Sequence, residues 1–203
     1  MYGVVVLVAT VVAVVGQLAS DVVEVALPTL TFWPVLPDGV EVFPAGDARV
    51  VGGGFTEALV SVTGLGTGAR MLLAAGSLVQ GLTQLTVTAA VFLLARRLLA
   101  GEPFRPVLSR AVMVAAVALI GGGILWQLCF GIGESMAAHE ALEVAGWNWG
   151  ASIGVDDPTT LLAEPRLGIT VEFWPIFTGM ALAAVAAAFR YGEKLQRDNA
   201  GLI

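Results

Sequence analysis

Residues 71–95 read MLLAAGSLVQGLTQLTVTAAVFLLA, a stretch with no charged side chain that lies between Arg70 and Arg96. A helix of ~20 apolar residues is long enough to cross the ~30 Å hydrocarbon core of a bilayer. The overall composition points the same way, because 57% of the 203 residues are hydrophobic, 13% are charged and the mean hydropathy is +0.86. Soluble domains are much less apolar. The stretch therefore predicts a transmembrane helix in an integral membrane protein.

Three further stretches predict spans of the same kind. They cover residues 1–20, 111–133 and 175–189, and each is poor in charge. Helix is the expected structure despite the many valines, since an unpaired backbone amide in lipid costs several kcal/mol. No Lys or Arg precedes Arg49, so the first stretch lacks the basic segment of a secretory signal and we expect a retained span.

The predicted fold is therefore an all-α transmembrane four-helix bundle with a small extracytoplasmic β-rich cap. Its organisation is helix 1 at 1–20, an extracytoplasmic β-rich segment at 21–70, helix 2 at 71–95, a cytoplasmic link at 96–110, helix 3 at 111–133, a second extracytoplasmic segment at 134–174, helix 4 at 175–189 and a cytoplasmic tail at 190–203.

The distribution of charge predicts the orientation. Seven of the ten Lys and Arg residues fall in the link and the tail, whereas thirteen of the sixteen Asp and Glu residues fall in the two other segments. Basic residues accumulate on the cytoplasmic side of membrane proteins. We therefore expect both chain ends in the cytoplasm of a multi-pass cell-membrane protein. The acidic pI of about 4.7 reflects the outer face, and without a basic groove we expect no direct nucleic-acid binding.

The motif Phe-Trp-Pro occurs twice, at Phe32–Pro34 and Phe173–Pro175, just outside the first and fourth predicted spans. Trp33 and Trp174 suit the headgroup layer, where an indole keeps its ring in lipid and its N–H in water. A shared ligand platform is the alternative interpretation. We also expect Phe32 and Phe173 to be buried in a folded outer region.

The outer segments contain strand-like runs separated by turn residues. These runs are Val40–Phe43, Ala48–Val51, Glu57–Val62 and Leu167–Phe173. A lone hairpin is marginal in water, so we expect the runs to combine across both segments into one small sheet. The stretch Glu134–Gly146 predicts a continuation of the third helix.

Two motifs invite a chemical interpretation. His139-Glu140-Ala-Leu-Glu143 resembles the start of a zinc-protease helix but lacks the second His that would complete it. A solvated helix face is the expected state of these residues, and a metal site formed with Glu134 is the alternative. The glycine-rich stretch Gly64–Gly68 lacks the Lys that follows the glycines in a phosphate-binding loop. We therefore expect it to be a flexible linker. We expect neither a cofactor nor a catalytic site.

Polar residues inside the spans are few. Gln80 and Gln84 share one face of the second span, and we expect them to form hydrogen bonds between helices. The glycines at 121–123 would let neighbouring backbones approach closely. No ionisable side chain lies in the middle of a predicted span, which argues against a pump or a coupled transporter. The single cysteine, Cys129, allows no disulfide within the chain.

Two inner motifs resemble a bacterial membrane family, the domain of unknown function 2975. One is Leu98–Phe104 followed by Arg105, which is similar to the family's G-x-P-F link between the middle spans. The other is the closing stretch Phe189–Asp198 followed by Gly-Leu-Ile at 201–203, which is similar to the end of the family's sequences. Asn199-Ala200 departs from the family's pattern. The resemblance implies four helices, and the family has no established activity. Such proteins frequently neighbour small repressors, so the resemblance also implies a transcription regulator as partner.

Three function classes stay open. A membrane sensor or regulatory partner of a cytoplasmic transcription regulator is the expected one, an accessory subunit of a larger membrane complex is the alternative, and an enzyme or transporter is third. The expected partners are the lipid bilayer and either the regulator or other membrane subunits. A docking face for the regulator is predicted on the link and the tail, at Glu102, Phe104, Arg105, Arg190, Lys194 and Arg197.

Overall fold

The computed structural model describes residues 1–33, 46–47, 50–100, 106–145 and 162–200, with the backbone alone for residues 106 and 196–200. Its elements are α1 (Tyr2–Ala19), β1 (Val22–Phe32), β2 (Phe55–Thr63), α2 (Thr67–Leu99), α3 (Pro106–Val117), the π-helical segment η1 (Ala118–Gly122), α4 (Gly123–Leu142) and α5 (Trp174–Ala200). The described chain is mostly helical, with one small two-stranded sheet.

Among the described residues, four helices are long and apolar enough to span a membrane, as the sequence predicts. They are Tyr2–Ala19, Thr67–Leu99, Val107–Leu142 and Trp174–Leu195. The third of these joins α3, η1 and α4 into one helix, and it extends beyond the predicted span at both ends. The π-helical turn inside it falls on Ala-Leu-Ile-Gly-Gly, where glycines weaken the α-helical preference.

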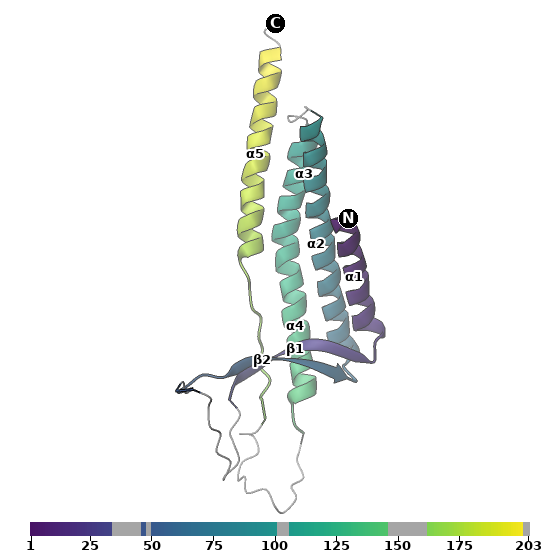
Figure 1. The fold of residues 1–203 in the computed structure, drawn as a ribbon, viewed down its shortest axis with the longest axis vertical. Helices are drawn as coiled ribbons and strands as arrows, with labels where there is room; N and C mark the ends of the chain where they lie inside the picture. Colours follow the sequence, from purple (N-terminus) through teal and green to yellow (C-terminus); the bar gives the residue numbers. More distant parts are fainter. Residues whose placement is uncertain (34–45, 48–49, 101–105, 146–161, 201–203) are drawn as a thin grey trace, which may run out of the picture.

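The helices lie side by side but are staggered along their length (Figure 1). α2 packs against α1 and α4, whereas α5 packs mainly along α3 and has few contacts with α4. Close approach relies on glycine, as expected for packing in lipid. Gly81 lies against Thr10 of α1, Gly122 against Thr83 of α2 and Gly179 against Ile120.

The sheet is an antiparallel pair with one buried face. Val23 pairs with Val62, and Val25 pairs with Val60. Val23, Val25 and Leu27 are buried while Glu24 between them is exposed, which is the period-2 pattern of a sheet with one face on a core. Beyond Pro28 the register shifts before the strands meet again.

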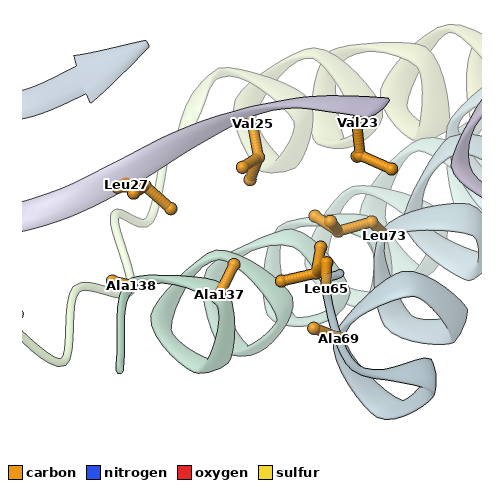
Figure 2. Close-up of a cluster of buried hydrophobic side chains, with 8 residues drawn as sticks. All are labelled: Val23, Val25, Leu27, Leu65, Ala69, Leu73, Ala137 and Ala138. Carbon is orange, nitrogen blue, oxygen red and sulfur yellow. The ribbon is translucent and has the colours of Figure 1, made fainter. Parts of the chain in front are cut away.

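The buried face of the sheet packs across the ends of α2 and α4 (Figure 2). The core there contains Val23, Val25, Leu27, Leu65, Ala69, Leu73, Ala137 and Ala138. Small alanines on the helices let β1 approach, and Leu27 is only 1% exposed. One continuous apolar core therefore joins the sheet to two of the long helices.

Several strand predictions need correction. β2 confirms the run at Glu57–Val62, but β1 was not predicted although its alternating valines carry the signal. The strand predicted at Leu167–Phe173 is wrong, because these residues are not paired with a strand. An isolated bridge to the sheet lies just before them, between Thr29 and Pro165. The run Val40–Phe43 and the first half of the run Ala48–Val51 lie outside the described residues, and Val50 and Val51 are not in a strand.

The turn before α2 is ordered, so the prediction of a flexible linker at Gly64–Gly68 is wrong. Gly64 has φ +73°, a conformation that favours glycine. Leu65 is buried in the core, and the Gly66 N–H donates to the Glu140 carboxylate at 2.7 Å. This acceptor lies at the positive end of the α2 dipole, where a carboxylate is stabilising. α4 ends at Leu142, so the helix predicted for Glu134–Gly146 is confirmed over most of its length.

The side chain of Arg70 connects the start of α2 to the end of α1. Its guanidinium donates to the backbone carbonyl of Gln17 at 2.7 Å and to that of Ser20. These carbonyls belong to the C-terminus of α1, where they have no partner within the helix. A cation is also favourable at a helix C-terminus. Arg70 therefore locks α1 to the first turn of α2.

Candidate functional site

The segment 162–173 leads from the sheet to α5 along the side of α4. At its start, the Leu30 N–H donates to the Glu164 carbonyl at 2.9 Å, and the Arg166 N–H donates to the Pro28 carbonyl at 3.0 Å. Pro28 has no backbone N–H, so its backbone can form a hydrogen bond with a neighbouring chain only through the carbonyl. The segment therefore begins bonded to the free edge of β1.

Side chains of α4 hold the rest of this segment. The Gln127 amide donates to the Glu172 carbonyl at 3.2 Å and accepts from the Glu172 N–H. The Gly168 N–H donates to the Ser135 hydroxyl at 3.2 Å. Between these contacts, Gly131 lets the backbone of Ile169 lie directly on the helix. Gln127 thus replaces a neighbouring strand as the hydrogen-bonding partner of an extended chain.

A cavity of about 250 Å³ opens where this segment, α2 and α4 meet. Its wall combines amides, carboxylates and aromatic rings. The lining residues are Gln80, Trp126, Gln127, Phe130, Gly131, Glu134, Gly168, Thr170 and Glu172. Among these described residues there is no Lys, Arg or His, so the wall carries two formal negative charges and no positive one.

Two indoles define the end of the cavity near α5. The rings of Trp126 and Trp174 lie 6.1 Å apart, tilted by 41°. The Trp174 indole N–H donates to the Glu172 carboxylate at 2.7 Å. Trp174 therefore positions a cavity-lining carboxylate. The sequence predicts that Trp174 lies in the headgroup layer. Its neighbour Pro175, however, packs against Gly123, which is well inside the charge-free part of the third predicted span.

Two polar side chains of the wall are unpaired within the described part of the chain. Gln80 and Glu134 are both half-buried, and neither has a hydrogen-bond partner there. The prediction that Gln80 and Gln84 bond to other helices is therefore wrong for the described residues. Gln84 is exposed, and the Thr83 and Thr88 hydroxyls donate to carbonyls of their own helix.

The four residues considered for a metal site have different surroundings. Glu134 faces the cavity, Glu140 accepts the Gly66 N–H, and His139 Nδ1 contacts the Ser135 carbonyl at 2.9 Å. Glu143 follows the last residue of α4. In the described ranges no three His, Cys, Asp or Glu side chains come close enough to hold a metal ion.

The two Phe-Trp-Pro motifs have different surroundings. Trp33 stacks on Phe55 with ring centroids 5.4 Å apart, at the end of the sheet. Phe32 is half-buried, but Phe173 is 60% exposed, so the predicted burial of Phe173 is wrong. The motifs do not form one ligand platform, because Trp174 pairs with Trp126 instead.

The predicted docking face is described only in part. Arg190 and Lys194 are exposed on α5. Glu102, Phe104 and Arg105 lie outside the described residues, and for Arg197 the backbone alone is described. These positions stay a prediction.

A second, larger hollow lies on the other side of the segment 162–173. It measures about 680 Å³ and is mainly apolar, with Ile132, Met136, Leu167 and Ile169 in its wall. The 250 Å³ cavity is the more informative of the two, because several kinds of polar group converge on it.

No family model, curated protein or solved structure matches this chain. The resemblance to the domain of unknown function 2975 therefore stays untested. Any function has to be argued from the geometry of the chain itself.

Proposed function

We propose that this protein is a multi-pass cell-membrane sensor with both ends in the cytoplasm, which passes a change in its outer region to a cytoplasmic regulator. The observation that carries the proposal is the segment 162–173. It is hydrogen bonded to β1 at one end, to α4 in its middle, and continues directly into α5 at the other end. A displacement of the sheet would therefore act on α5.

Membrane insertion is supported by the exposed surface of the helices. α1 leaves Val4, Val8 and Val12 each more than half exposed, and such a continuous apolar surface is unfavourable in water. The orientation is supported by charge. The end of α2, the start of α3 and the C-terminal part of α5 point away from the sheet (Figure 1). Arg96, Arg110 and Arg190 belong to these parts of the helices, as the positive-inside rule requires of a cytoplasmic side.

This topology predicts a labelling pattern. In a Cys129→Ser background, a cysteine replacing Asp47 is expected to react with an impermeant thiol reagent on intact cells. A cysteine replacing Lys194 is expected to react only after the membrane is opened. The measurement is gel-shift labelling of each single-cysteine variant. Labelling of the Lys194 position from outside would reverse the orientation and remove the sensor proposal.

The stagger of the helices explains why α5 would respond. α5 begins opposite Gly123, so beyond that point the extended segment takes the place of α5 beside α4. In a membrane, non-helical backbone at this depth is tolerated where it is buried in protein or lines a watery cavity. α5 has few contacts with α4, so it could shift along α4 together with the segment that leads into it.

Coupling is tested by releasing the segment from α4. Gln127→Leu removes both hydrogen bonds to Glu172 but keeps a side chain of similar volume. We expect the reaction rate of a cysteine at position 194, measured in opened membranes, to change at least about threefold. Gln84→Leu, an exposed glutamine on α2, is the matched control and is expected to leave the rate unchanged. Equal rates in both variants would contradict coupling through this segment.

The regulator is expected to dock where α5 presents its charge. Arg190 and Lys194 are exposed at the end farthest from the sheet, and a shift of α5 would move them directly. An acidic surface on the partner would complement these two cations.

A further inference from the structure

The cavity between α2, α4 and the segment 162–173 has the chemistry of a binding site for a small cation. Two carboxylates, those of Glu134 and Glu172, line it together with the ring of Trp126. Two carboxylates that line one cavity, with no cationic side chain among its lining residues, favour a positively charged occupant. An aromatic face beside them favours an ammonium group, which it attracts through its quadrupole.

The unpaired amide of Gln80 strengthens this argument. Gln80 and Glu134 are half-buried, and neither has a hydrogen-bond partner within the described residues. They come from different helices, α2 and α4, and line the same cavity. A ligand with a hydrogen-bonding group would satisfy both.

The size and the wall of the cavity favour an organic cation over a metal ion. Its volume of about 250 Å³ is far larger than a bare ion needs, and lies just below the ~300 Å³ at which pockets begin to hold drug-sized ligands. Phe130 and Trp126 supply rings where a hard cation would need oxygen ligands. Trp174 holds the Glu172 carboxylate through its indole N–H, so one anionic contact is fixed in place.

We propose that this cavity binds a small organic cation carrying an ammonium group, with Glu134 and Glu172 as its counter-charges and Trp126 as its aromatic contact. The ammonium group could belong to a free molecule or to a lipid headgroup. If the proposed sensor function holds, this is the signal that it detects, because Glu172 and Thr170 belong to the segment that leads into α5. Binding does not itself require that function.

The test is equilibrium binding of radiolabelled choline to the purified full-length protein in detergent. We expect saturable binding with a Kd of about 1 mM or lower. The neutral carbon analogue 3,3-dimethylbutan-1-ol is expected to compete at least ~10-fold less well, because it keeps the shape of choline but not its charge. Equal competition by the neutral analogue, or no saturable choline binding up to ~10 mM, would overturn the proposal.

Variants locate the site. Glu134→Gln is expected to weaken choline binding at least ~10-fold, whereas Glu143→Gln, an exposed carboxylate beyond the same helix, is expected to leave it unchanged. If Glu134→Gln does not fold, Glu172→Gln replaces it, and the comparison of choline with its neutral analogue needs no variant. Equal binding by the cavity variants and the control would place choline elsewhere and contradict the proposal.

Two further measurements separate the alternatives. Tighter binding of a short-chain phosphatidylcholine than of choline would assign the site to a lipid headgroup, and weaker binding would assign it to a free cation; both support the cation site. Choline binding that leaves the labelling rate at position 194 unchanged would keep this site but contradict the sensor function.

Discussion

Replacing Leu27 with Ala is expected to lower the free energy of unfolding by about 2–5 kcal/mol, the cost of removing a fully buried leucine side chain. Leu27 is 1% exposed and lies in the core that β1 shares with α2 and α4. The neighbouring atoms come from three different elements, so they cannot all close the resulting cavity. The measurement is thermal unfolding of the purified protein in detergent, followed by tryptophan fluorescence.

Leu59→Ala is the matched control for this prediction. Leu59 lies on the paired strand β2, but its side chain is on the opposite face and is 70% exposed. Its replacement is expected to change the stability by less than about 0.5 kcal/mol. Similar losses in the two variants would show that both faces of the sheet are covered, which contradicts a sheet with a single buried face.

Replacing Gly179 with Leu is expected to destabilise the protein by about 1–3 kcal/mol and to detach α5 from α3. A Cβ at this position would meet the Ile120 side chain and would lie 2.9 Å from the Ala116 carbonyl oxygen. The backbone carbonyl cannot move without shifting the whole helix. α5 has few other contacts, so the overlap would push it away. Limited proteolysis within α5, together with the melting temperature, measures this change.

Gly121→Leu is the control for the glycine variant. Gly121 is exposed, and a Cβ there would meet nothing within 4 Å. Leucine also has the higher helix propensity, so the control is expected to melt at the same temperature or slightly above. If Gly121→Leu were as damaging as Gly179→Leu, the glycines would act through backbone conformation and not through the close contact of α5 with α3.

The sequence determined the number of the long helices and the apolar part of each. Charge is excluded from residues 71–95 and 111–133, and exclusion of charge over ~20 residues is a local property that needs no knowledge of neighbours. The same kind of local reasoning predicted β2 and most of the extension of α4. β1 also carries a local signal, since Val23, Val25 and Leu27 alternate with Glu24 and Ala26.

The candidate site could not be predicted in the same way. Gln127 and Glu172 are 45 residues apart, and nothing local distinguishes Gln127 from Gln84, which is exposed. Glu172 lies in the second predicted outer segment, between two predicted spans. The tertiary fold nevertheless brings it beside α4, where its backbone is bonded to Gln127.

Tertiary structure alone decided the stagger of the helices, and with it the cavity. α5 starts opposite Gly123 because Pro175 fits against that glycine, and the residues before it must then run extended along α4 to reach the sheet. The length of an apolar stretch predicts that the segment is a helix. Hydrophobicity is nearly uniform along each helix, however, so it cannot specify how far one helix is shifted along its axis relative to the next. Contacts between particular small residues, such as Gly81 with Thr10 and Gly179 with Ile120, provide that information, because only they distinguish one register of packing from the next.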